Sequence, residues 1–167
     1  MKIFIAADHA GFELKKFLIE ELKTQGHEMI DCGAHQLIEG DDYPQYISKA
    51  ARNVSETEIA RTRGAIPADA EEVRGIVIGG SGQGEAIVAN RYEAVRAALY
   101  YGGPEEIVKL SREHNDANIL SLGARFLTQA EALKAVKLWL GTKFVGGRHE
   151  RRVIEIDELA DEKEIFG

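Results

Sequence analysis

The sequence has one cysteine, only three prolines and no long apolar run. With Cys32 alone, no disulfide can form within the chain, which is typical of a protein from a reducing compartment. No apolar run approaches the roughly 18–20 residues that a membrane-spanning helix needs. The N-terminal MKIFIAADHAGF has too short an apolar stretch before Asp8 for a signal peptide. We therefore expect a cytoplasmic protein that does not bind a membrane.

Basic residues are scarce relative to acidic ones. The 167-residue chain has 21 lysines and arginines against 28 aspartates and glutamates, a net charge of −7. A general nucleic-acid binder is usually basic, so this balance argues against nucleic acid as a partner. It leaves room for a local basic pocket that binds a small anion. Residues 1–167 have the length of one ordinary domain, which needs no disulfide or metal to hold its core.

Short apolar runs alternate with amphipathic stretches along the chain. The runs predict five strands: Lys2–Ala7, His27–Asp31, Gly75–Ile78, Ala94–Tyr100 and Asn118–Leu122. The amphipathic stretches predict six helices: Gly11–Gln25, Tyr43–Val54, Gly82–Arg91, Pro104–Glu113, Thr128–Leu140 and Arg148–Asp161. Because each crossover helix must pack back on the sheet, this order predicts an α/β fold, with a five-stranded parallel sheet and helices on both faces.

One charged stretch does not fit this alternation. Ser55–Arg74 contains Gly64 and Pro67, and we expect it to form a long surface insertion before the third strand. Loops of this length are either functional or mobile.

Ligands of such sheets bind beyond the carboxyl ends of the strands. Asp8 and His9 follow the first predicted strand, and the segment 41–43 (DDY) lies after the second. Gly79–Glu85 follows the third strand, and Gly123–Arg125 follows the fifth. We therefore expect a binding site at this edge.

The glycine-rich loop after the third strand is the most distinctive motif. Its residues after Gly79 are Gly80, Ser81, Gly82, Gln83, Gly84 and Glu85. Alternate glycines let backbone N–H groups approach a phosphate or a developing oxyanion. The spacing is neither a dinucleotide fingerprint nor a P-loop, because no Lys-Ser/Thr follows and Glu85 would repel a pyrophosphate. A plain strand-to-helix turn is the alternative interpretation.

Glu85 lies in the first turn of the helix that follows this loop. A carboxylate there can simply compensate the helix dipole. Alternatively, it is a general base beside oxyanion donors, a pairing that suits removal of a proton next to a carbonyl group.

Histidines and arginines supply the other candidates. His9 could be a ligand-binding side chain or a hydrogen-bonded structural one, and His114-Asn115 could be a helix C-cap. Arg148 and Arg152 share a helix face, which suits a bound phosphate but also fits a solvated surface. The five histidines show no metal-ligand spacing, so we expect no metal.

Four segments together resemble the type B ribose-5-phosphate isomerases, a family that includes allose-6-phosphate and galactose-6-phosphate isomerases. The segments are ADHAGFELK at 7–15, GGSGQGEAIVANR at 79–91, SREHNDANILSLGAR at 111–125 and GGRHERRVIEI at 146–156. The resemblance implies a Rossmann-like three-layer α/β/α sandwich. It also implies aldose–ketose isomerisation of a phosphorylated sugar through an enediol, without metal or cofactor.

The resemblance also assigns roles to residues of this chain. Asp8 and His9 would contact the sugar phosphate, Gly80 to Gly84 would form the anion hole, and His114 would open the sugar ring. Substrate-binding roles fall to Asn115, Arg125, Arg148 and Arg152, with His149 as a further candidate. Much of the family has a cysteine base where this chain has Gly79. Glu85 matches a branch whose base follows the loop, and family members usually lack or shorten the 55–74 insertion.

The order of elements predicts a shared site. If 104–113 is a crossover helix, His114 lies toward the far edge of its own sheet, and so does Arg148. We therefore expect a homodimer or dimer of dimers in which a partner subunit donates at least one of these groups.

Ribose 5-phosphate is the expected substrate, and a six-carbon sugar phosphate is the alternative. A non-catalytic sugar-phosphate sensor would need the arginines but neither Glu85 nor His114. A nucleotide-binding oxidoreductase is disfavoured by the glycine spacing.

Overall fold

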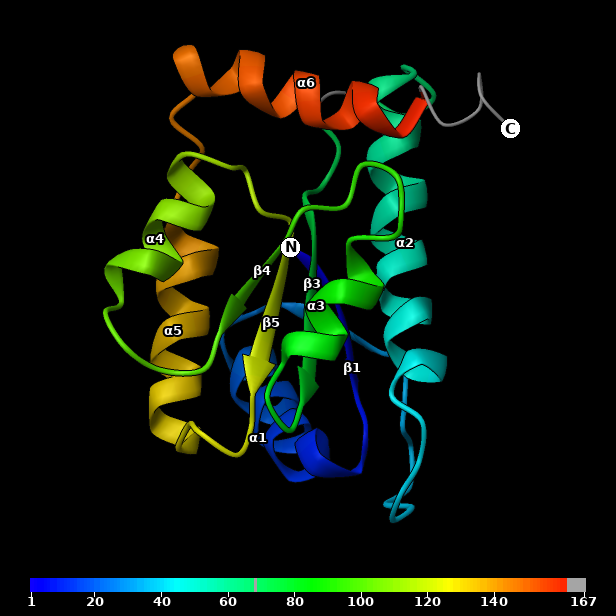
Figure 1. Ribbon diagram of the computed structural model, residues 1–167, viewed down its shortest axis with the longest axis vertical. Coiled ribbons are helices and arrows are strands. Elements are labelled where there is room, and N and C mark those ends of the chain that lie inside the picture. The colour runs from blue at the N-terminus through cyan, green and yellow to red at the C-terminus, as the bar shows by residue number, and fades with distance from the viewer. Residues whose placement is uncertain (68, 162–167) are drawn as a thin grey trace.

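The computed structural model describes residues 1–67 and 69–161. Five strands form one parallel sheet in the order β2-β1-β3-β5-β4 (Figure 1). The strands are β1 (Lys2–Ala7), β2 (Glu28–Asp31), β3 (Val73–Gly79), β4 (Ala97–Tyr100) and β5 (Ile119–Gly123). This sheet confirms the predicted Rossmann-like α/β fold.

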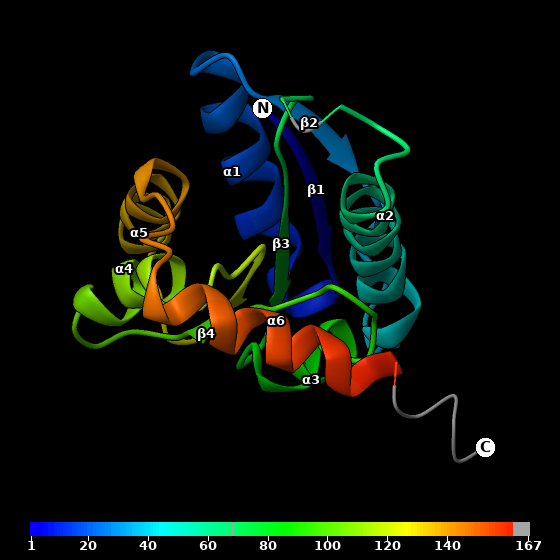
Figure 2. The same ribbon diagram turned by 90° about the horizontal axis from the view of Figure 1, so that it is seen from above.

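Helices cover both faces of the sheet and one of its ends (Figure 2). They are α1 (Phe12–Thr24), α2 (Pro44–Thr62), α3 (Gln83–Ala89), α4 (Glu106–Glu113), α5 (Gln129–Gly141) and α6 (Arg148–Asp161). The helices α1, α4 and α5 pack on one face, and α2 and α3 pack on the other. The last helix, α6, crosses the end where the strands begin (Figure 1).

The alternation of side chains along β1 explains the two faces. Ile3 and Ile5 belong to the core under α1 and α5, whereas Phe4 and Ala6 belong to the core under α2. Successive side chains of a strand point to opposite faces, so a strand covered on both sides is apolar throughout. The nearly continuous apolar run of Lys2–Ala7 is thus the signature of a central parallel strand.

The predicted insertion at Ser55–Arg74 differs from the structure. Helix α2 continues to Thr62, and β3 begins at Val73, so only the residues between them form the connection. Ser55 is buried at the helical spacing set by Ala51. Arg61 also donates hydrogen bonds to the carbonyl oxygens of Ala70 and Glu71, which ties the connection to the helix. The spacing of apolar residues carries no information about such hydrogen bonds, so it could not predict this arrangement.

Strand β4 is shorter than expected. Ala94 has a positive φ of 58°, and the strand begins at Ala97. The side chain of Asn118 accepts a hydrogen bond from the Arg96 N–H at 2.8 Å and donates one to the Ala94 carbonyl at 2.7 Å. The Asn118 side chain therefore makes the hydrogen bonds to Ala94 and Arg96 that a neighbouring strand would otherwise make.

Among the described residues, no helix is both long and apolar enough to cross a lipid bilayer.

Lys15 is a fully buried cation between α1 and the end of β2. Only 1% of the residue is exposed, and its ammonium group donates to Asp31 Oδ1 at 2.6 Å and to the Ala34 carbonyl oxygen. We expect Lys15→Ala to lower the free energy of unfolding by about 2–4 kcal/mol, because it leaves a void and an unpaired carbonyl group. Urea unfolding measures this difference.

Lys16→Ala is the matched control for this substitution. Lys16 is the next residue along α1, and its pair with Glu13 is exposed. Its loss is expected to cost no more than about 0.5 kcal/mol. Equal effects of the two substitutions would show that burial of Lys15 has no consequence for stability.

Candidate active site

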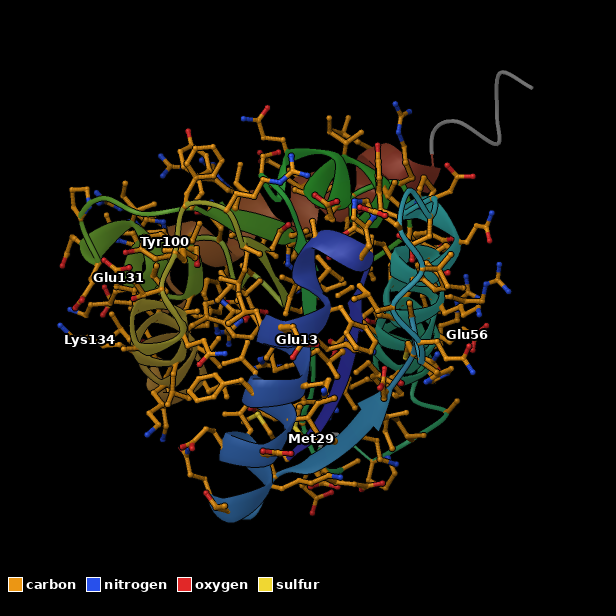
Figure 3. The ribbon with its side chains drawn as sticks, turned by 90° about the horizontal axis from the view of Figure 1, so that it is seen from below. Glu13, Met29, Glu56, Tyr100, Glu131 and Lys134 are labelled. Atoms are coloured by element: carbon orange, nitrogen blue, oxygen red, sulfur yellow. The ribbon has the colours of Figure 1, made fainter. Side chains whose placement is uncertain are left out.

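The predicted residues that follow β1, β3 and β5 lie together at the carboxyl ends of these strands. Figure 3 looks onto this end of the molecule, with α6 behind the sheet. Asp8 directly follows β1, and its side chain caps the short 3-10 turn His9–Gly11. Its Oδ1 accepts hydrogen bonds from the N–H groups of Ala10 at 3.0 Å and Gly11 at 3.2 Å. The buried Asp8 carboxylate thereby fixes the position of His9.

His9 is held by Asp41, from the connection between β2 and α2. Asp41 Oδ1 lies 2.9 Å from the His9 backbone nitrogen and 2.8 Å from its Nδ1. Burial alone would raise the pKa of Asp41, but the hydrogen bonds from His9 and Tyr46, together with the charge of His9, outweigh it and lower that pKa. Asp41 thus orients the imidazole with Nε2 left for a ligand. Sequence reasoning placed residue 41 near the site but gave it no role.

Asp8, His9 and Asp41 also form a group with the composition of a metal site. Their candidate ligand atoms lie within 4.8 Å of one another, although the sequence spacing predicted no such group. Two of these atoms, His9 Nδ1 and Asp41 Oδ1, are already hydrogen-bonded to each other. The arrangement therefore serves to orient His9, and the expectation of a metal-free site stays a prediction.

The glycine loop turns sharply between β3 and α3. Gly82 adopts a left-handed conformation with φ of 76°, and the Ser121 hydroxyl donates to its carbonyl oxygen at 2.6 Å. The N–H groups of Ala124 and Arg125 donate to the carbonyl oxygens of Gly79 and Gly80. These hydrogen bonds tie the carbonyl oxygens of the loop to β5 and to the turn that follows it.

Glu85 is buried in the first turn of α3, directly against the loop. Only 4% of the residue is exposed, and a Cβ atom added at Gly79 would collide with its carboxyl group. Burial raises the pKa of Glu85, and the negative charge of Asp8 raises it further, while the N–H groups of Glu85 and Gly82 oppose the rise. A raised pKa makes a carboxylate a stronger base, which suits proton transfer.

Arg125 and Tyr43 border the same loop. A Cβ at Gly80 would lie 3.2 Å from the Arg125 guanidinium carbon, and one at Gly84 would lie 2.6 Å from the Tyr43 hydroxyl. Arg125 is exposed and makes no ion pair within the described part of the chain. Arg125 therefore places a positive charge beside the glycine loop. Tyr43 belonged to the predicted edge but was not singled out for a role.

The remaining predicted residues lie at the opposite end of the sheet. His114 follows α4, and its ring stacks on that of His149 with centroids 4.1 Å apart. Desolvation lowers the pKa of His149, and the positive charges of His114, Arg148 and Arg152 lower it further. Asn115, Arg148 and Arg152 flank this pair in the chain. None of these residues joins Glu85, because α4 runs back toward the end where the strands begin (Figure 1).

Comparisons with known proteins agree over nearly the whole chain. Residues 3–156 match the family described as Ribose/Galactose Isomerase. A ribose-5-phosphate isomerase B of Mycobacterium tuberculosis is 42% identical over 96% of this chain and 89% of its own length.

Solved structures of ribose-5-phosphate isomerases B are also similar to this chain over nearly its whole length. A ribose-5-phosphate isomerase B of Mycoplasma genitalium with bound ribulose-5-phosphate superposes with a TM-score of 0.85 at 36% identity. The match covers 96% of this chain and 97% of that one. A ribose-5-phosphate isomerase B of Clostridium thermocellum has a TM-score of 0.81 at 40% identity, over 98% and 99% of the two chains.

The buried Glu85 carboxylate predicts a stability effect that depends on pH. Its pKa is raised in the folded state, so the folded protein favours the protonated form and loses stability as the pH rises above the unfolded value. We expect Glu85→Gln to unfold at higher urea concentration than the native chain at pH 7. The gain should shrink near pH 4, where the native carboxyl is largely protonated as well. A less stable variant at pH 7 would contradict the raised pKa.

Proposed function

Because the chain belongs to the ribose/galactose isomerase family, we propose that it interconverts ribose 5-phosphate and ribulose 5-phosphate. The observation that carries this proposal is the buried carboxylate of Glu85 beside the glycine loop at the carboxyl end of β3. A base with a raised pKa next to backbone N–H donors is what proton transfer beside a carbonyl group requires. The relatives named above supply the choice of sugar.

In the proposed reaction, the Glu85 carboxylate takes the proton from C2 of the open-chain aldose. As the C2–H bond breaks, negative charge develops on the carbonyl oxygen O1, and backbone N–H groups of Ser81 to Gly84 stabilise it. The hydroxyl proton of O2 passes to O1 through the enediol, and Glu85 returns its proton to C1. The C1–H bond forms as C2 becomes the ketone, so no atom or electron is gained or lost.

The substrate-binding roles follow from charge. Arg125, Arg148 and Arg152 bind the phosphate group, since guanidinium groups form paired hydrogen bonds with phosphate oxygens. Asp8, Asn115 and His9 contact the sugar phosphate, with His9 oriented by Asp41. His114 acts as the acid that opens the ring. These steps move protons only, and the residues named can carry them without a cofactor.

A second copy of the chain completes this site in our proposal. Glu85 and Arg125 lie at one end of the sheet, whereas His114, Arg148 and Arg152 lie at the other. If two copies of the chain packed in opposite orientations, Glu85 and Arg125 of each copy would meet His114, Arg148 and Arg152 of the other. The dimer would then contain two complete sites. Exposed apolar side chains on α6, those of Ile154, Ile156 and Leu159, supply surface for the contact. We infer that the protein forms a homodimer or a dimer of dimers. A cytoplasmic location stays a prediction, which rests on the single cysteine.

A six-carbon sugar phosphate is the second candidate, because the matching family is described by both ribose and galactose. One extra carbon changes binding only modestly, so the relative kcat/KM on ribose 5-phosphate, allose 6-phosphate and galactose 6-phosphate decides between them.

Glu85→Gln tests the base directly. The amide keeps the shape of the side chain but cannot take a proton, so we expect kcat on ribose 5-phosphate to fall by roughly 10³-fold or more, with KM little changed. Glu13→Gln, on the exposed side of α1, is the control. A kcat for Glu85→Gln close to that of the native enzyme would remove the proposed role of Glu85.

Co-expression of two inactive variants tests the shared site. A dimer of one Glu85→Gln chain and one His114→Ala chain would carry both substitutions in one site and neither in the other. Random pairing should therefore restore about a quarter of the native sites. If each site were built from one chain, every site would carry one substitution, and the mixture would be no more active than the average of its parents.

A further inference from the structure

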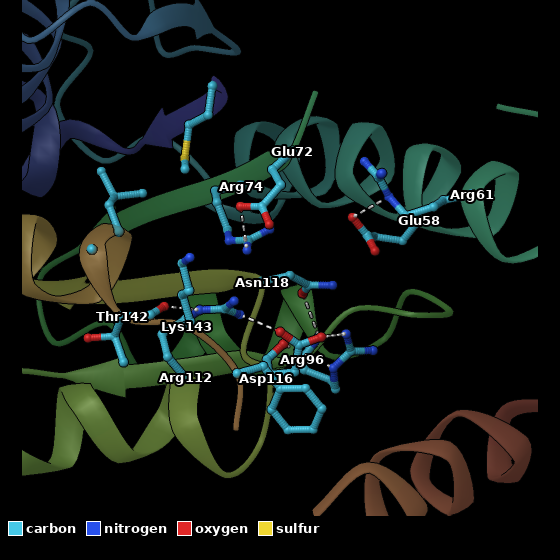
Figure 4. Close-up of a pocket in the computed structure, with 14 residues that line it drawn as sticks. Glu58, Arg61, Glu72, Arg74, Arg96, Arg112, Asp116, Asn118, Thr142 and Lys143 are labelled. Carbon is cyan, nitrogen blue, oxygen red and sulfur yellow. Dashed lines mark hydrogen bonds and ion pairs between the residues drawn. The ribbon is translucent and has the colours of Figure 1, made fainter. Parts of the chain in front are cut away.

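A cavity of about 640 Å³ opens at the end of the sheet where the strands begin, opposite Glu85. Its walls come from α2, the start of β3, the turn before β5 and the segment after α5 (Figure 4). We call it the basic cavity, after five cationic side chains that line it. They are Arg61, Arg74, Arg96, Arg112 and Lys143.

Positive charge exceeds negative charge around the basic cavity. The five cationic side chains and the N-terminal ammonium group of Met1 face three carboxylates. These are Glu58, Glu72 and Asp116. Two carboxylates from outside the lining reach these cations: Glu71 lies 3.1 Å from the Met1 nitrogen, and Asp157 lies 3.0 Å from Arg96. The cations still outnumber all five carboxylates, although the whole chain is strongly acidic.

Arg112 is nearly buried and has unused hydrogen-bond donors. Only 3% of the residue is exposed. Its Nε donates to the Thr142 carbonyl oxygen at 3.3 Å, and its Nη1 donates to Asp116 Oδ1 at 2.7 Å and to the Ala117 carbonyl oxygen at 2.6 Å. Within the described residues, Nη2 makes no hydrogen bond. Two N–H groups of a guanidinium in the cavity wall are therefore left for a guest.

Arg74 repeats this pattern at the start of β3. The residue is 8% exposed, and it donates from Nη1 to the Val73 carbonyl oxygen at 2.8 Å and from Nη2 to Glu72 at 3.1 Å. Its Nε has no acceptor in the part of the chain that the structure describes. This Nε is not among the fully buried unpartnered atoms of the described residues, so water can reach it and a guest could take the place of that water.

The two guanidinium groups also act on each other. Burial lowers the pKa of Arg112, and the positive charge of Arg74 lowers it further, while Asp116 opposes both effects. A bound anion would relieve this repulsion and accept from the unused N–H groups. Guanidinium groups recognise phosphate through such paired, charge-assisted hydrogen bonds.

We propose that the basic cavity is a second anion site, which binds a small phosphate-bearing molecule between Arg74 and Arg112. None of the residues that line it has a role in the proposed catalytic machinery. Lys143 is exposed at its edge and adds attraction, whereas Glu72 competes with the guest for Arg74.

Equilibrium dialysis with radiolabelled inorganic phosphate tests the proposal. The parent protein carries Arg125→Met, Arg148→Met and Arg152→Met, which removes the arginines assigned to the substrate phosphate. We expect this folded parent to bind one phosphate per chain. Adding Lys143→Glu should weaken binding roughly fivefold or more, and adding Glu72→Gln should tighten it about threefold, as expected for charge changes beside a partly buried site.

Matched controls separate the cavity from net charge. Lys23→Glu and Glu20→Gln make the same charge changes at exposed positions of α1. The proposal holds if each cavity variant shifts the Kd in its expected direction and further than its control does. Absence of saturable binding in the parent, or equal shifts in a variant and its control, overturns it. Displacement of the label by ribose 5-phosphate would identify sugar phosphates as guests, and displacement by phosphate alone would identify the free ion.

Discussion

The burial of the Glu85 carboxylate against Gly79 is the interaction on which the proposed chemistry depends. Glu85 occupies the space over Gly79 in which any larger residue would place its side chain. Strand β3 places Gly79 next to this carboxylate, and the left-handed turn at Gly82 begins the helix that carries Glu85. Burial raises the pKa of the Glu85 carboxyl group. A charged group in this setting costs stability, and that cost is typical of a site shaped by function rather than by folding.

The parallel sheet decides which residues can cooperate. All strands end at the same edge, so Asp8, the glycine loop and Arg125 meet there although they are distant in the chain. Helix α4 must run the other way, and it delivers His114 to the opposite edge. The proposed site residues of one chain therefore lie at two opposite edges of the sheet, and this separation is the reason for proposing a dimer. The basic cavity lies at that same opposite edge.

The sequence predicted an element correctly where a single type of interaction determines the local structure. The apolar run Lys2–Ala7 predicts β1 because both faces of that strand are covered. Helix α5 begins with a capping box between Thr128 and Glu131, and a Thr followed three residues later by Glu is the local signal for such a helix start. The glycine spacing and Glu85 predicted the core of the candidate site. In each case the residues that determine the structure are close together in the chain, so their spacing indicates the strand, helix or turn.

The sequence was insufficient where long-range polar contacts decide the outcome. Asp41 is 32 positions from His9, and nothing in its neighbourhood predicts that it holds the imidazole. Helix α2 extends to Thr62, and Arg61 in its last turn donates hydrogen bonds to the carbonyl oxygens of Ala70 and Glu71, contacts that apolar spacing does not predict. Arg74 and Arg112 belong to separate elements, and only the fold brings them to one cavity. Pairings of this kind follow from the packed sheet and not from spacing.

The most direct measurement is the titration of the Glu85 carboxyl group by ¹³C NMR in the selectively labelled native protein. The burial of this group against Gly79 predicts a midpoint above the roughly 4.3 of an unperturbed glutamate. A midpoint at or below that value would mean that solvent or a cation reaches the carboxylate. The account of Glu85 as a desolvated base would then be wrong.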